Sequence, residues 1–228
     1  MRKWWTPMPG FTKLDGTRRR RAVTKSESMF VAYCEANGIP FKRIPESTVR
    51  TPDYAIQLGQ VEVVCEVKQL EMSDSEKRAW QDVRNKGVGA HWVQNRLRRR
   101  LKNVSGQLRA ASSRGTPTMV VVFDNTPFQA ELRHEDVVQA LYGRLAYPVV
   151  VSGDGELALD APFFGGDRGL TPTQNTSVSA VAVLEKLGEG LSLRTYHNLH
   201  AVVGLKPCLL EGLPVRQMVV PGDTTIEV

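Results

Sequence analysis

The most regular apolar pattern of the chain lies between residues 93 and 111, and it predicts a long amphipathic helix. The apolar residues recur at steps of four and three, as Val93, Leu97, Leu101, Val104, Leu108 and Ala111. Gly115 and Pro117 end this helix, and the segment TMVVVFD at 118–124 follows. A short uninterrupted apolar run of this kind is typical of a buried strand.

A second helix is predicted to begin at Thr24, ahead of three short extended segments. The tetrapeptide TKSE is a capping box, in which Thr24 caps the helix and Glu27 follows three residues later. Gly38 and the following Ile39-Pro40 end the helix. The extended segments are PFKRIP at 40–45, DYAIQL at 53–58 and VEVVCEVKQ at 61–69, with Gly59-Gln60 as the turn between the last two.

The remaining segments are less regular. Residues 1–23 are predicted to form a basic arm, and the polar, glycine-spaced stretch 72–90 is predicted to be a long loop. In the C-terminal half, EDVVQALYG is expected to be helical, and YPVVVS, SAVAVLEK, LSLRTYHN and QMVV are expected to be strands. No linker separates residues 126–228 from the preceding part, so this half is expected to extend the same sheet.

The composition is that of an ordinary soluble globular protein, with 41% hydrophobic and 24% charged residues among 228. No window approaches the roughly 18 uninterrupted apolar residues of a membrane helix, and no apolar run follows the basic N-terminus as in a secretory signal. Cys34, Cys65 and Cys208 form no CxxC pair, so neither a disulfide framework nor a zinc site is expected. We therefore expect a cytoplasmic protein with no membrane partner.

Positive charge is concentrated in two segments. Residues 1–25 contain eight Lys or Arg against the single acid Asp15, a net charge of +7, and residues 91–114 contain seven and no acid, again +7. The whole chain carries only +6, so the remainder sums to −8. Two basic segments on an acidic background predict a polyanion-binding surface, or alternatively a solubilising tail and a solvated helix face.

Two carboxylates and an amine interrupt the apolar pattern of the second and third extended segments. Glu66 and Lys68 lie on the same face of the third segment because side chains alternate along a strand. A turn at 59–60 places Asp53 almost opposite Glu66. Adjacent carboxylates repel unless a cation lies between them, and oxygen ligands favour magnesium or manganese. The alternative is an ordinary surface salt-bridge ladder.

Polar residues of the long helix follow the rhythm of its apolar stripe. Arg96, Arg100, Asn103 and Gln107 are spaced so that they flank the stripe, and such a row could follow a phosphate backbone or form a solvated face. The four histidines are interpreted as structural. In the extended segment HNLH, residues 197 and 200 would point to opposite faces.

The order and spacing of these residues resemble the PD-(D/E)XK nuclease superfamily. The resemblance rests on four features: Glu27 in a helix, PD at 52–53, EVK at 66–68 and Gln107 in the following helix. Glu66 of the EVK tripeptide lies thirteen residues after Asp53. It covers residues 24–125 and implies a restriction-endonuclease-like α/β (mixed α+β) core of order αβββαβ, with a central mixed sheet flanked by helices. Residues 126–228 would then be a C-terminal α/β extension or a small accessory region.

The resemblance also implies roles for individual residues. Asp53 and Glu66 would bind Mg²⁺ or Mn²⁺ together with the backbone carbonyl of Val67, and Glu27 would bind a second metal ion. Lys68 would position the attacking water and stabilise transition-state charge. Gln107 would support the site. The expected reaction is metal-assisted hydrolysis of phosphodiester bonds, with endonuclease action favoured over exonuclease action.

The expected partner is DNA rather than RNA, and a homodimer is left open. The residues expected to bind nucleic acid are Arg18, Arg19, Arg20, Arg21, Arg96, Arg99, Arg100 and Lys102. The alternative functions are a non-catalytic nucleic-acid-binding protein, or a subunit of a larger phage, defence or recombination complex on the same fold.

Overall fold

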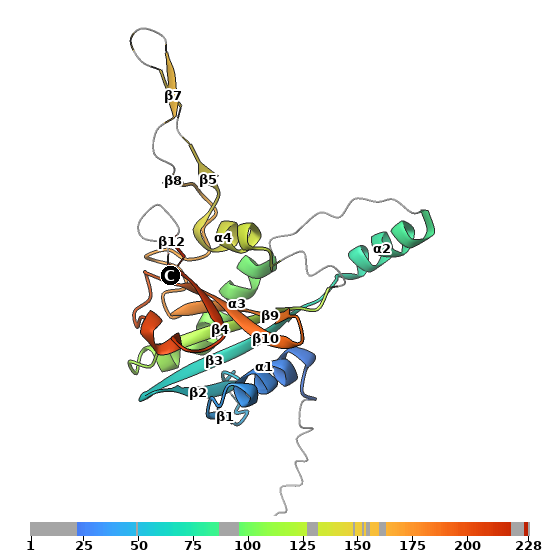
Figure 1. The fold of residues 1–228 in the computed structure, drawn as a ribbon, viewed down its shortest axis with the longest axis vertical. Coiled ribbons are helices and arrows are strands. Elements are labelled where there is room, and N and C mark those ends of the chain that lie inside the picture. The colour runs from blue at the N-terminus through green and yellow to red at the C-terminus, as the bar shows by residue number, and fades with distance from the viewer. Residues whose placement is uncertain are drawn as a thin grey trace, which may run out of the picture.

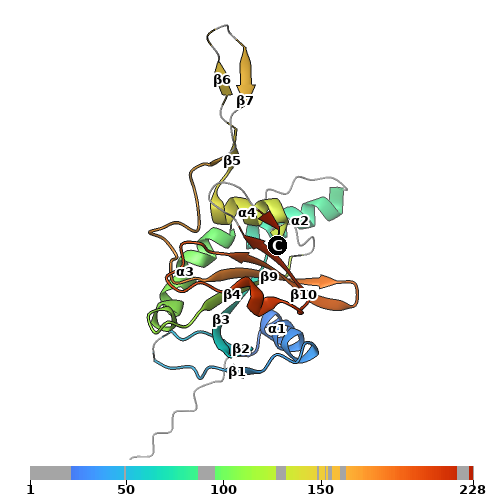
Figure 2. The ribbon, with the colours of Figure 1, turned by 60° about the vertical axis from the view of Figure 1, so that its left-hand side comes forward.

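The described part of the chain forms one eight-stranded mixed sheet with helices on both faces (Figure 1 and Figure 2). The computed structural model describes residues 22–48, 50–86, 96–126, 132–147, 149–151, 153, 156–159, 163–219 and 226–227. The helices are α1 (Lys25–Ala36), α2 (Asp74–Lys86), α3 (Arg96–Ser112), α4 (His134–Tyr142) and the short 3₁₀ helix η2 (Pro207–Leu210). The strands are β1 (Phe41–Arg43), β2 (Tyr54–Leu58), β3 (Val61–Leu70), β4 (Thr118–Asp124), β5 (Leu145–Ala146), β6 (Val149–Val151), β7 (Leu157–Leu159), β8 (Phe163–Phe164), β9 (Ala180–Leu187), β10 (Gly190–His197), β11 (Val215–Val219) and β12 (Ile226–Glu227).

The N-terminal half of the sheet is built from a meander and a crossover. Strands β1, β2 and β3 pair antiparallel in chain order, and β4 then pairs parallel to β3 after the helix α3. The predicted order of helix, three strands, helix and strand is therefore present, with α2 as an addition. The expected mixed α/β architecture, a central mixed sheet flanked by helices, is confirmed.

Four strands of the C-terminal half continue this sheet, and its other described strands form the two-stranded sheets β5–β8 and β6–β7. Strand β9 pairs parallel to β4, and the order then runs through β10 and β11 to β12. The predicted helix and the four predicted strands of this half correspond to α4, β6, β9, β10 and β11. Strands β5, β7, β8 and β12, each two or three residues long, were not expected because such short strands carry no readable periodicity.

Side-chain alternation divides the core into two layers. On one face of the sheet, Leu101 and Leu108 of α3 pack with Val64 and Val120. On the other face, α1 packs against the alternate residues of the same strands, so that Phe30, Tyr33 and Cys34 join Val63, Cys65, Val67, Met119 and Val121. The period of two along β3 and β4 thus assigns each side chain to one helix layer.

The prediction of a loop at 72–90 is wrong for its greater part, because residues 74–86 form α2. Ser73 caps this helix: its Oγ accepts from the backbone N–H of Glu76 at 3.3 Å, and its own N–H donates to Glu76 Oε2 at 2.6 Å. This is a second capping box. The helix buries none of its residues and projects away from the sheet (Figure 1), so no apolar stripe marked it in the sequence. Residues 87–90 lie outside the described part.

A second projection is the hairpin of β6 and β7. Within the described residues, these strands pair only with each other. They extend beyond α4 and β5 (Figure 2). Cys34 and Cys65 are buried and Cys208 is exposed, and all three are free thiols. Among the described helices, none is both long and apolar enough to cross a membrane.

Candidate active site

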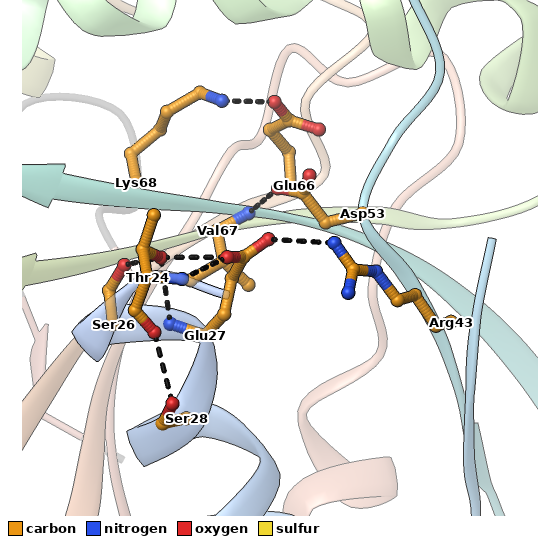
Figure 3. Close-up of polar contacts among 9 residues, drawn as sticks. All are labelled: Thr24, Ser26, Glu27, Ser28, Arg43, Asp53, Glu66, Val67 and Lys68. Carbon is orange, nitrogen blue, oxygen red and sulfur yellow. Dashed lines mark hydrogen bonds and ion pairs between the residues drawn. The ribbon is translucent and has the colours of Figure 1, made fainter. Parts of the chain in front are cut away.

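The register of β2 and β3 brings Asp53 beside Glu66. Tyr54 pairs with Cys65, so the residue before Tyr54 lies opposite the residue after Cys65. The backbone N–H of Val67 donates to Asp53 Oδ2 at 2.9 Å and holds this carboxylate just before the start of β2 (Figure 3). The predicted juxtaposition of Asp53 and Glu66 is therefore present.

Glu66 is a buried carboxylate with incomplete pairing. Its side chain is 1% exposed, and its Oε1 forms an ion pair with Lys68 Nζ on the same face of β3 (Figure 3). Its Oε2 has no hydrogen-bond partner within the described residues. Burial and the nearby Asp53 carboxylate raise the pKa of Glu66, while Lys68 and Gln107 oppose this rise. A cation placed between Asp53 and Glu66 would relieve both the burial cost and the repulsion.

An open pocket of about 540 Å³ adjoins these residues. Asp53 and Lys68 line it from the strands, and Arg100, Asn103 and Gln107 line it from α3. The polar row predicted along the long helix thus borders the strand site from Arg100 onward. Gln107 Nε2 also donates to the Thr51 carbonyl at 3.4 Å, which links α3 to the segment before Asp53.

Two arginines of the pocket, Arg43 and Arg50, were not predicted from the sequence. Arg43 ends β1, and Arg50 precedes the PD dipeptide by two residues. Both line the pocket together with Lys68 and Arg100. The only available signal was a cation close before the PD dipeptide, and nothing in the local sequence distinguishes these arginines from ordinary surface residues.

Glu27 lies on the opposite side of β3 from Glu66 and Lys68 (Figure 3). Its side chain is 2% exposed, and its Oε2 accepts hydrogen bonds from the backbone N–H of Thr24 at 2.6 Å and from Thr24 Oγ1 at 2.9 Å. Its Oε1 lies 3.9 Å from Arg43 Nη2. The structure therefore does not bring Glu27 to the other two carboxylates, although Arg43 connects it to the rim of the pocket.

The residues expected to bind nucleic acid fall into separate groups. Arg96 is occupied, because its guanidinium pairs with Glu76 of α2 at 2.8 Å and also donates to the Glu71 carbonyl. Arg100 faces the pocket beside Asp53, whereas Arg99 and Lys102 border a different hollow. The arginines at 18–21 lie outside the described residues.

Among the described histidines, His197 has both ring nitrogens within hydrogen-bond distance of other protein groups. His197 is buried, with Nδ1 at 3.0 Å from the Leu205 carbonyl and Nε2 at 2.9 Å from Gln217 Oε1. Burial lowers the pKa of His197, against the opposing effect of these two hydrogen bonds. No group of three or more His, Cys, Asp or Glu that could hold a metal ion occurs within the described ranges.

Comparison of the chain with family models, with curated proteins and with solved structures finds no match.

Proposed function

We propose that this chain hydrolyses phosphodiester bonds of nucleic acid, with DNA as the expected substrate, through a PD-(D/E)XK-type site at Asp53, Glu66 and Lys68. The observation that carries the proposal is the buried Glu66 carboxylate, which has one oxygen without a hydrogen-bond partner among the described residues and lies next to a second carboxylate. A cationic pocket suited to phosphate adjoins this pair. The carboxylates of a surface salt-bridge ladder are exposed to solvent, so this alternative does not account for the burial of Glu66.

The donor set fits a hard divalent cation. Asp53 and Glu66 supply two carboxylates. The N–H of Val67 points toward Asp53, and a residue's carbonyl points to the same strand edge as its N–H. The Val67 carbonyl is therefore available as a third oxygen. Mg²⁺ is commonly bound by one or two carboxylates together with substrate phosphate and water, so a third acidic side chain is not required. When bound, such an ion polarises the phosphate and lowers the pKa of a coordinated water.

The remaining pocket residues would bind and orient the substrate. Lys68, held by Glu66, is placed to stabilise charge on a phosphate oxygen or to orient the attacking water. Arg43, Arg50 and Arg100 would bind the flanking phosphates, because guanidinium groups match phosphate oxygens in geometry and charge. We leave Glu27 out of the ligand set because it lies across β3 and its Oε2 caps α1. Gln107 remains a positioning residue for the segment before Asp53.

The second candidate function is nucleic-acid binding without hydrolysis, either alone or within a larger phage, defence or recombination complex. The same pocket would then hold phosphate while no bond is cut. The two functions differ in one outcome: a protein that only binds nucleic acid yields no cleavage product when Mg²⁺ or Mn²⁺ is present.

The test is cleavage of plasmid, labelled duplexes and labelled single strands with Mg²⁺, Mn²⁺ or EDTA. We expect metal-dependent cleavage, and we expect Lys68→Ala and Glu66→Gln each to slow it by about 100-fold or more. The matched controls are Lys42→Ala and Glu62→Gln, which alter a surface ion pair of β1 and β3 whose side chains are 68% and 46% exposed. The controls should change the rate by less than about twofold. Undiminished cleavage in Lys68→Ala and Glu66→Gln would refute the assigned site.

A further inference from the structure

A second cationic hollow lies on the other flank of α3, away from the strand carboxylates. Arg98, Arg99 and Lys102 line it from the helix. The segment 165–169, of sequence GGDRG, lines it from the C-terminal half of the chain. Its volume is about 610 Å³, comparable to that of the pocket at Asp53. The consecutive residues Arg99 and Arg100 therefore line two different hollows.

The segment 165–169 is held tightly in place against α3. Arg98 Nη1 donates to the Asp167 carbonyl at 2.8 Å and pairs with Asp167 Oδ1 at 2.9 Å. Arg168 Nε donates to the Gly165 carbonyl at 3.0 Å, and Asn175 Nδ2 donates to the Gly169 carbonyl at 2.6 Å. Two of the lining cations, Arg98 and Arg168, are thus used to shape the wall of the hollow.

Close backbone packing accounts for a glycine in this wall. A Cβ atom on Gly169 would lie 2.5 Å from the carbonyl oxygen of Ala140, a contact that no other residue could accommodate without a backbone shift. The neighbouring Asp167 has a φ of 64°, a left-handed conformation that is uncommon outside glycine. A segment held in this way keeps its geometry when an anion binds.

The charge of the hollow suits a polyanion. Four cationic side chains line it against a single carboxylate, Asp167, which is already paired with Arg98. Arg99 and Lys102 are exposed, lie one helical turn apart, and have no ion pair within the described part of the chain. Thr171 and Gln174 add neutral polar groups. Two uncommitted cations beside hydroxyl and amide groups match phosphate oxygens.

We propose that this hollow binds the phosphate backbone of nucleic acid to one side of the scissile phosphodiester bond. The C-terminal half of the chain would then take part in substrate binding. This role rests on the proposed function. The bound nucleic acid would extend from the catalytic pocket at Asp53 to this second hollow. Helix α3 would then contact two backbone segments at once, one through Arg100 and the other through Arg99 and Lys102.

The test is fluorescence anisotropy of labelled duplexes and single strands in EDTA, over a series of salt concentrations, with the double variant Arg99→Gln/Lys102→Gln. We expect the affinity to fall by about tenfold or more. We also expect the slope of log K against log salt to become shallower by about 1 to 2, because two phosphate contacts are lost. The matched control is Arg109→Gln/Arg114→Gln, which removes the same charge from an exposed position in the last turn of α3 and from an exposed position in the turn that follows it. This control should leave both quantities nearly unchanged.

The arms of this experiment separate the possible sources of phosphate. Loss of affinity for single strands as well as duplexes supports contact with the cleaved strand, and loss for duplexes alone supports contact with the complementary strand. An affinity and salt slope equal to those of the control variant would overturn the proposal. So would a variant that loses affinity for inorganic phosphate in calorimetric titration while it binds polynucleotide unchanged.

Failure of the proposed hydrolysis remains distinguishable from failure of this site. If the wild-type protein binds but never cuts, and the double variant binds weakly, the flanking site stands without the nuclease. If the wild-type protein cuts with metal, and the double variant binds and cuts like the control, the nuclease stands without the flanking site.

Discussion

Burial, rather than residue type, distinguishes the two glutamates on the same face of β3. Glu62 and Glu66 lie four residues apart, and each pairs with a lysine. Glu62 is exposed and its ion pair with Lys42 contributes little to stability, as is usual at a surface. Glu66 is buried and half paired, a condition that costs stability unless a ligand compensates for it. Buried carboxylates with a raised pKa and a nearby charged partner are concentrated at functional sites of proteins.

His197 is predicted to make the stability of the fold depend on pH. Its folded-state pKa is lowered by burial, so the unfolded chain binds a proton more readily than the folded chain as the pH falls below the ordinary value of 6.5. The free energy of unfolding should therefore be fully retained above pH 6.5 and should decrease as the pH falls through that value toward the lowered pKa.

Urea denaturation at a series of pH values checks this prediction. We expect His197→Gln to weaken the decrease of the free energy of unfolding at low pH. We also expect it to lower the free energy of unfolding by about 1 to 3 kcal/mol at neutral pH, because the buried partner Gln217 loses its hydrogen bond. The control is His200→Gln, at an exposed position in the same HNLH segment, which should behave like the wild type. An unaltered pH profile in His197→Gln would exclude His197 as the source.

At the scale of single elements, α1 and α2 begin with the same device but depend on it differently. Each has a capping box, at Thr24 with Glu27 and at Ser73 with Glu76. Helix α1 buries Phe30, Tyr33 and Cys34 against the sheet, whereas α2 buries no residue. Tertiary packing supplies most of the stability of a helix of this length, so the exposed helix depends more on its cap.

The cap substitutions Thr24→Ala and Ser73→Ala should therefore differ in effect: the first should destabilise the whole fold and the second only its own helix. Thr24→Ala should lower the global free energy of unfolding by about 1 kcal/mol, because α1 is part of the cooperative core. Ser73→Ala should leave the urea midpoint unchanged and should speed hydrogen exchange of the amides in 74–86 several-fold, because α2 opens locally. A shift of the urea midpoint in Ser73→Ala as large as that in Thr24→Ala would contradict this assignment.

For the molecule as a whole, the hairpin of β6 and β7 stands apart from the eight-stranded sheet. Val149, Val151 and Leu157 are 61%, 63% and 74% exposed, so the hairpin leaves apolar side chains in solvent. Within the described residues, its strands pair only with each other. A two-stranded hairpin of this kind is marginally stable in water and adds little to the stability of the core.

Replacement of residues 149–159 by a short Gly-Ser linker should therefore leave the melting temperature within about 2 °C of the wild type. It should also reduce concentration-dependent aggregation, because exposed apolar strand edges pair with other chains. Calorimetry and light scattering measure the two quantities. The comparison variant is Leu141→Ala, at a fully buried position of α4. This substitution should lower the free energy of unfolding by about 2 to 5 kcal/mol. A loss of stability in the linker variant as large as in Leu141→Ala would show that the hairpin belongs to the core.

Local patterns in the sequence determined most of the N-terminal half. The apolar stripe of α3, the alternation along β3 and the capping box of α1 each lie within one element, so their period can be read without knowing the fold. The juxtaposition of Asp53 and Glu66 was also predictable, because a tight turn at Gly59, with a φ of 56°, sets the register of the two strands. The capping box of α2 is equally local, but without an apolar stripe after it the sequence does not predict a helix there.

Only the tertiary structure decided how these elements combine into sites. Alternation shows that Glu66 and Lys68 share a face of β3, but the packing of α1 on the other face is what separates Glu27 from them. Likewise, Arg43 and Arg50 reach the pocket at Asp53, and the segment 165–169 meets Arg98, through contacts between distant parts of the chain. Such contacts depend on the order of the strands in the sheet and on which helix covers which face, and neither leaves a periodic signal in the sequence.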